Sequence, residues 1–214
     1  VLFSRWFGPL LLGLLLAWSL RIMLGSEGWT LATGLPLLVI LSGYAGLTLW
    51  LQYTRRRKVH DATSMYFRVA MLSILAFAAL SLLSLMRPEV GADPRTAVWQ
   101  GILVFSGVFV SGITGMIYKI VPFLNWLHLQ RLGAPLSAVP NMRKMIPADA
   151  MTGQLRLHLL ATALLLVAVW EPVLVRLAGA MFAASCAWLG WNVAAAVRRY
   201  QTFRDQIRAA ALHC

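Results

Sequence analysis

"MYFRVAMLSILAFAALSLLSLM", residues 65–86, decides the fold class of this chain. Arg68 is the only charged side chain in the stretch. About 20 consecutive, mostly apolar residues suffice for an α-helix to cross the hydrocarbon core of a bilayer. A block of this length is longer than the core helix of a soluble domain usually needs. The stretch therefore predicts a membrane-spanning helix.

The composition of the whole chain agrees with this prediction. Of its 214 residues, 60% are hydrophobic and 12% are charged, and the mean hydropathy is +0.73. In soluble domains about a quarter of the residues are charged. Lipid admits only helices and closed barrels, and the apolar blocks here are continuous rather than alternating. We therefore predict an all-α fold, a polytopic transmembrane helical bundle.

Six apolar blocks predict six spans within a single transmembrane domain, residues 1–214. The first block follows Arg5 without a convincing small-x-small cleavage site, so we interpret it as a retained span rather than a signal peptide. Residues 119–150, between the fourth and fifth spans, are expected to lie along the cytoplasmic membrane surface. The predicted spans are 7–24, 31–53, 65–86, 98–118, 155–170 and 173–197.

The charges orient these spans. "TRRRKVHD" (54–61), the loop after the fourth span and the tail after residue 197 are basic, whereas the alternate loops contain most of the acidic residues. Cytoplasmic loops concentrate Lys and Arg, so we predict that both termini are cytoplasmic (N-in/C-in) in a bacterial inner membrane. The formal net charge of +12 then reflects the concentration of Lys and Arg in the cytoplasmic loops. Without a soluble basic domain we expect no nucleic-acid partner. The expected partners are the lipid bilayer and either other membrane proteins or further copies of the chain.

A stripe of small residues runs along the fourth predicted span. Gly107, Ser111 and Gly115 follow one another at four-residue intervals. Such stripes let helices approach closely in lipid. The next position on the stripe is Lys119, which we therefore expect to face a neighbouring helix or a cleft. Pro122 is predicted to kink or end this helix.

Polar side chains gather where this span reaches the cytoplasmic side. Tyr118, Lys119 and Asn125 are candidates for a ligand pocket, because ionisable residues near a membrane core are often functional. The histidines of the cytoplasmic side are candidate haem or metal ligands. Purely interfacial roles remain open for the lysine and for the histidines, none of which is predicted at mid-membrane. The three histidines are His60, His128 and His158.

Three segments resemble a known group of proteins: "GMIYKIVPFLNWLHLQ" (115–130), "VPNMRKMIP" (139–147) and "LHLLATALLL" (157–166). They look like motifs of uncharacterised proteobacterial inner-membrane proteins that loosely resemble haem–copper oxidase subunit I-like proteins and are sometimes labelled permeases. The resemblance covers residues 99–195 and implies a respiratory role with haem. Catalytic haem–copper subunits, however, carry several histidine ligands inside their helices, and this chain shows no such set.

Three functions follow as hypotheses. The first is a haem- or respiration-associated accessory subunit with a polar pocket on the cytoplasmic side. The second is a small permease in which Lys119 binds an anionic solute. The third is a structural or assembly protein without a ligand. No nucleophile–base–orienter set is recognisable, so we predict no catalytic residues and no self-contained enzyme.

Overall fold

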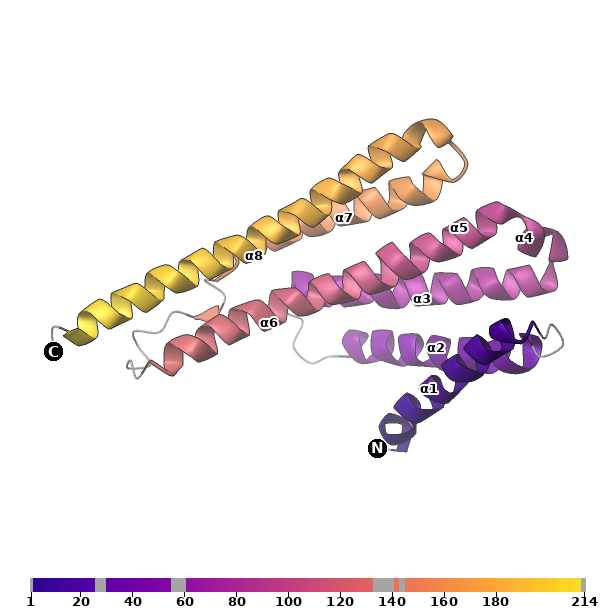
Figure 1. The fold of residues 1–214 in the computed structure, drawn as a ribbon, viewed down its shortest axis with the longest axis horizontal. Coiled ribbons are helices and arrows are strands. Elements are labelled where there is room, and N and C mark those ends of the chain that lie inside the picture. Colours follow the sequence, from indigo (N-terminus) through magenta and orange to yellow (C-terminus); the bar gives the residue numbers. More distant parts are fainter. Residues whose placement is uncertain (1, 26–29, 55–60, 133–140, 143–144, 213–214) are drawn as a thin grey trace.

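A computed structural model of the chain describes residues 2–25, 30–54, 61–132, 141–142 and 145–212. These residues form helices and contain no strand, so the all-α prediction is confirmed. Figure 1 shows the helices in sequence colours. They are α1 Leu2–Met23, α2 Thr30–Tyr53, α3 Ala62–Met86, α4 Pro88–Ala92, α5 Pro94–Ile102, the π-helix η2 Leu103–Val110, α6 Ser111–Gln130, α7 Ala148–Ala168, the 3-10 turn η4 Pro172–Leu174 and α8 Val175–Leu212.

Six helical stretches are long and apolar enough to cross a membrane. Their outer surface is apolar: Trp191 is 64% exposed, Phe105 61% and Phe109 58%. Many of the fully buried positions are instead polar. Exposed apolar surface of this extent suits contact with lipid rather than water. The chain is therefore a multi-pass membrane protein. The six stretches are Trp6–Met23, Leu31–Tyr53, Ala62–Met86, Pro94–Gln130, Ala148–Ala168 and Pro172–Ala209.

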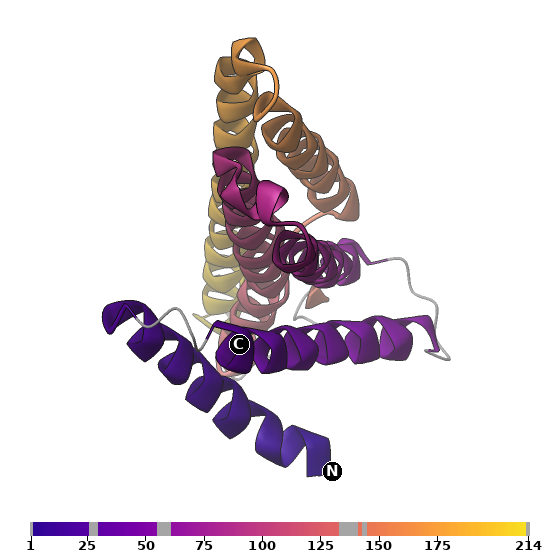
Figure 2. The same ribbon diagram turned by 90° about the vertical axis from the view of Figure 1, so that its right-hand side faces the viewer.

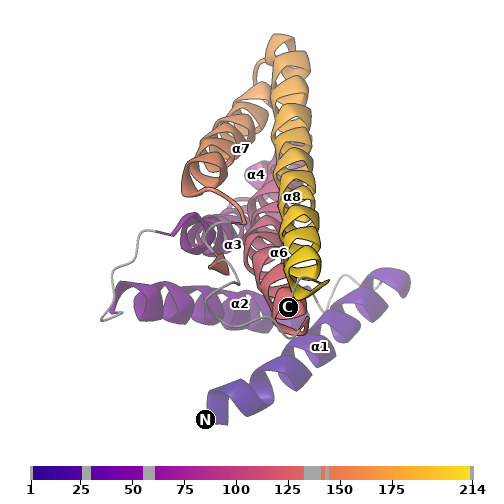
Figure 3. The same cartoon turned by 90° about the vertical axis from the view of Figure 1, so that its left-hand side faces the viewer.

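Helices α1 and α2 pack in sequence onto α3, and α3 forms a bundle with the helices that follow it. Helix α1 packs on α2, and α2 packs on α3. Helix α3 lies against η2, α6 and α7, while α8 pairs with α7 and α6. Figures 2 and 3 show α1 and α2 on one side of α3, and α7 and α8 on the other. The bundle of α3, α5–η2–α6, α7 and α8 therefore contains most of the buried residues, and a smaller cluster around Ala45 lies between α2 and α3.

Small residues let the central helix approach α3. A Cβ atom placed on Gly107 would lie 2.6 Å from Ser73 Cβ, and one on Gly115 would lie 3.1 Å from Tyr66 Cβ. Both glycines belong to the stripe noted in the sequence. Its middle member, Ser111, is fully buried and is directed to α7 rather than to α3. Close backbone approach of this kind increases van der Waals contact between membrane helices.

Helix α7 begins seven residues before the predicted start of the fifth span. It starts at Ala148, directly after Pro147, which occupies the N-cap position. Proline favours the start of a helix because its backbone has no N–H to leave unpaired. His158 is consequently the eleventh of the 21 residues of α7. His158 therefore lies at the middle of α7, whereas the predicted span placed it in its first turn.

The central helix runs on past Pro122. Helices α5, η2 and α6 form one stretch of 37 residues, Pro94–Gln130. The segment predicted to lie along the membrane surface thus begins as a continuation of this helix. The reason is a small apolar cluster outside the predicted spans, in which Leu129 and Met145 are buried against Phe203 and Ile207 of α8. Burial against α8 favours continued helix over a flat interfacial segment.

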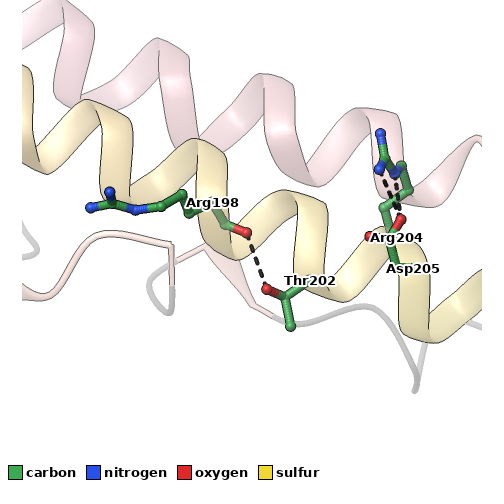
Figure 4. A network of polar contacts seen from close by, with 4 residues as sticks. All are labelled: Arg198, Thr202, Arg204 and Asp205. Carbon is green, nitrogen blue, oxygen red and sulfur yellow. Dashed lines mark hydrogen bonds and ion pairs between the residues drawn. The ribbon is translucent and has the colours of Figure 1, made fainter.

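Helices α6 and α8 project together beyond the other helices, at the end of the bundle near the C-terminus (Figure 1). We call this the basic end, because α8 carries four arginines there after residue 197. Figure 4 shows Thr202 Oγ1 donating to the Arg198 carbonyl at 3.2 Å and Arg204 paired with Asp205 at 2.8 Å. Arg199 donates to the Met145 carbonyl at 2.8 Å. The contact from Arg199 fixes the start of α7 to α8.

Candidate functional site

One face of α7 carries polar side chains at four-residue intervals. Gln154, His158 and Thr162 are 1%, 1% and 8% exposed. Residues four apart lie one above another on a helix, so the three point into the bundle together. Each is hydrogen-bonded to another helix. These side chains belong to two hydrogen-bonded groups, one around Gln154 and one around His158, which meet where the Tyr66 ring lies beside the His158 ring. We call them together the polar row: Tyr66, Ser106, Ser111, Tyr118, Gln154, His158, Thr162, Ser185 and Asn192.

Gln154 joins three other helices. Its Oε1 accepts hydrogen bonds from the hydroxyls of Tyr66 in α3 and Tyr118 in α6. Its Nε2 donates to the carbonyl and the hydroxyl of Ser185 in α8, at 3.2 and 3.1 Å. All the hydrogen-bonding groups of this amide are thus occupied. Gln154 is therefore the residue at which the four helices of the bundle meet.

Tyr118 and Asn125 connect α6 to α8. Asn192 Nδ2 donates to the Tyr118 hydroxyl at 2.8 Å. One step closer to the basic end, Asn125 Nδ2 donates to the Ala196 carbonyl at 3.2 Å. Tyr118 is 3% exposed and Asn125 9% exposed. Both predicted pocket residues therefore serve interhelical contacts.

His158 occupies the middle of the row. Its Nε2 lies 2.9 Å from the Ser111 hydroxyl, and the same hydroxyl donates to the Ser106 carbonyl at 3.2 Å. A hydroxyl has a single hydrogen to donate. With the Ser111 hydrogen on the Ser106 carbonyl, the Ser111 oxygen is an acceptor for His158. In this tautomer the neutral ring carries its hydrogen on Nε2 and leaves Nδ1 bare.

The bare nitrogen of His158 is buried. Nδ1 has no hydrogen-bond partner among the described residues. The ring lies between aromatic side chains, 5.8 Å from the Tyr66 ring and 6.3 Å from the Phe182 ring, measured between centroids. A buried acceptor without a partner costs about 1–3 kcal/mol. This nitrogen is thus the place in the row where a proton would be bound.

Beyond His158 the row continues away from the basic end. Thr162 Oγ1 lies 2.6 Å from Ser106 Oγ. One turn further, Trp99 Nε1 donates to the Leu166 carbonyl at 2.8 Å. The Trp99 ring also packs on Trp170, which lies beneath the guanidinium of Arg95. Hydrogen-bonding groups therefore follow one another along most of the length of α7.

The structure does not bring the predicted pocket residues together. Lys119 is exposed, with Nζ 5.5 Å from the centroid of the Phe67 ring, rather than facing a cleft. His128 is also exposed and packs against Tyr200 of α8. His60 lies outside the described residues. Of the predicted residues, the row contains only Tyr118, His158 and Ser111.

The described histidines do not fit a shared haem. Ser111, the partner of His158, precedes His128 by 17 residues in α6, which is about 25 Å at 1.5 Å per residue. The ring of His158 is covered by Tyr66 and Phe182, and its Nε2 is occupied by Ser111. Within the described ranges no three His, Cys, Asp or Glu side chains form a group that could hold a metal ion.

No protein-family model matches the chain. No curated protein and no solved structure matches it either. The resemblance to haem–copper oxidase subunit I-like proteins therefore stays a prediction.

Sequence reasoning missed most of the row. Gln154, Tyr66 and Asn192 were not candidates, although Gln154, His158 and Thr162 show the four-residue spacing of one helical face. Ser185 and Asn192 are seven residues apart, which also places them on one face of α8. These spacings could have identified the row. They were overlooked because the fifth span was predicted to start at residue 155, which placed Gln154 outside the membrane.

Proposed function

We propose that this chain is a proton-conducting membrane subunit in which His158 binds and releases the proton. The observation that carries the proposal is the buried, unpartnered Nδ1 of a histidine in the middle of a helix, within a row of hydroxyl and amide groups. Ionisable side chains that face the interior of a membrane bundle commonly belong to proton relays and ion pathways. A respiratory accessory subunit and a proton-coupled permease would both use such a site.

The groups around His158 favour the binding of a proton over the binding of an anionic solute. Histidine changes charge between about pH 5 and 8, so it can take up and release protons under ordinary conditions. The titratable group that faces it is Tyr66 of α3, which shares the acceptor Gln154 with Tyr118 of α6; α8 presents Phe182. No Asp, Glu, Lys or Arg is among the buried side chains of the described residues. An anionic solute would lack a buried cation to pair with.

The proton balance at His158 is simple. A proton that arrives from the basic end binds Nδ1 and converts the ring to an imidazolium. The ring becomes neutral again when Nε2 releases its own hydrogen to a hydroxyl oxygen or a water molecule on the Thr162 side. The starting tautomer is restored when the hydrogen on Nδ1 is passed back to Nε2 through a water molecule or hydroxyl groups. One proton thus enters and one leaves for each cycle.

A purely structural role explains the row less well. Hydrogen bonds between Ser, Thr, Asn and Gln side chains suffice to hold membrane helices together. A histidine placed only for that purpose would be expected to pair both ring nitrogens, because buried polar atoms in native proteins nearly always have partners. In His158 only Nε2 is paired among the described residues.

Replacement of His158 by glutamine is expected to abolish proton flux. The glutamine side chain could still donate an amide hydrogen to Ser111, so the bundle should fold, but an amide does not bind a proton near neutral pH. The measurement is the internal pH of proteoliposomes loaded with a pH-sensitive dye, after a potassium diffusion potential is applied. The wild type should acidify or alkalise the lumen with the sign of the potential, and His158→Gln should match liposomes without protein.

His128→Gln is the matched control, because it makes the same change at an exposed histidine outside the row. It should retain the wild-type flux. Wild-type protein that conducts no faster than empty liposomes, or a His158→Gln variant that conducts like the wild type, would refute the proposal.

We also propose that both ends of the chain face the cytoplasm of a bacterial inner membrane. The six spans found among the described residues would place α1 and α8 with their outer ends on one side, and the basic end is the side that the Lys and Arg distribution assigns to the cytoplasm. Alkaline phosphatase fused after Leu212 should be inactive in cells, whereas a fluorescent protein fused there should fluoresce. An active phosphatase at that position would reverse the orientation.

A further inference from the structure

The central helix contains a π-helix directly opposite His158. Segment η2 covers eight residues, Leu103–Val110, between the regular helices α5 and α6. Ser106 lies inside it and Ser111 follows it. Their partners on α7, Thr162 and His158, are four residues apart, whereas the two serines are five apart. The hydrogen-bonding side chains of the two facing helices therefore meet only because the central helix is locally wound as a π-helix.

The π winding is what aligns the two serines. In an α-helix with 3.6 residues per turn, residues five apart are about 140° apart around the axis. Ser106 and Ser111 could then not both face α7. A π-helix closes its hydrogen bonds over five residues, so residues five apart lie on the same side. If η2 relaxed to an α-helix, one of the two contacts with α7 would be lost.

The π winding blocks the exit of a proton from Nε2 of His158. In the tautomer with hydrogen on Nε2, the ring faces the Ser111 hydroxyl at 2.9 Å, and that hydroxyl donates to the Ser106 carbonyl. A carbonyl oxygen has no hydrogen to pass on. The proton is therefore retained until Ser111 moves away from the ring.

We infer that η2 alternates between π and α winding, and that this change frees the Nε2 proton of His158. The inference rests on the proposed proton conduction and names the element that regulates it. The π winding is the closed form, in which Ser111 covers Nε2. The α winding is the open form, in which Ser111 has turned away from the ring. Short π segments within α-helices frequently occur at functional sites.

Deletion of Phe109 tests this inference. Phe109 is 58% exposed and lies between the two serines. Without it, Ser106 and Ser111 are four residues apart, so a plain α-helix aligns both with Thr162 and His158. The variant should fold, keep both contacts and lose the ability to change winding. We expect its proton flux to fall to that of His158→Gln.

Phe109→Ala is the matched control, since it removes the same side chain and keeps the backbone residue. It should conduct like the wild type. A folded deletion variant with wild-type flux would overturn the inference and leave the proposed function intact. Loss of the proposed function would appear differently, as wild-type flux in His158→Gln.

A measurement on the wild type covers the case in which the deletion variant does not fold. Backbone carbonyl chemical shifts of residues 103–110 should be recorded in lipid nanodiscs at about pH 8 and about pH 5, on either side of the ordinary range of histidine. We expect these shifts to change with pH in the wild type and not in His158→Gln. Shifts that are the same at both values would refute the alternation.

Discussion

Gln154→Leu is expected to lower the free energy of unfolding by about 2–4 kcal/mol. Leucine has a similar volume but leaves the hydroxyls of Tyr66, Tyr118 and Ser185 without their partner. Each buried polar group that loses its partner costs about 1–3 kcal/mol, although in membranes part of this cost is recovered through new partners. The measurement is reversible unfolding by a denaturing detergent in mixed micelles.

Gln201→Leu provides the control, because it makes the same change at an exposed position of α8. It should change the unfolding free energy very little. A double-mutant cycle adds a sharper test: Tyr66→Phe should cost less in the Gln154→Leu background than in the wild type, because the hydroxyl no longer has its acceptor. Equal costs in the two backgrounds would mean that Gln154 does not hold α3 to α7.

Gly107→Ala is expected to destabilise the contact between the central helix and α3 by about 1–3 kcal/mol. The new Cβ would lie 2.6 Å from Ser73 Cβ, too close for the two backbones to stay in place. The same unfolding experiment measures the effect. Ser73→Gly combined with Gly107→Ala should restore most of the lost stability, because it removes the atoms that collide.

Gly112→Ala is the matched control on the same helix. A Cβ there meets no atom within 4 Å. Alanine favours a helix over glycine by about 1 kcal/mol, so this variant should be neutral or slightly stabilised. Equal destabilisation by both alanines would mean that the close approach at Gly107 is not what limits the packing.

The spans could be predicted from the sequence because they appear in it as long apolar blocks. The predicted stretch of residues 65–86 corresponds to α3, Ala62–Met86, because lipid demands the same length and composition from every spanning helix. Helix ends outside the lipid follow other rules. Pro147 set the start of α7 and the contact of Leu129 with Met145 let α6 continue, and neither effect is visible in hydropathy.

The candidate site was predictable only in its residue types. The sequence alone drew attention to Tyr118, His158 and the Gly107–Ser111–Gly115 stripe, since polar or small residues stand out against an apolar background. It also suggested Lys119 and His128, which the structure leaves exposed. Hydropathy measures how apolar a residue's surroundings should be, and it carries no information on which helix face meets which neighbour.

By itself the sequence determined that this chain is an all-α membrane protein with six apolar helices, because the bilayer constrains each helix independently of the others. Only the tertiary structure decided that Gln154 joins four helices, that His158 faces Ser111, and that η2 brings Ser106 and Ser111 to the same side. Those features depend on the rotation of each helix about its axis. That rotation is set by contacts between residues far apart in the chain.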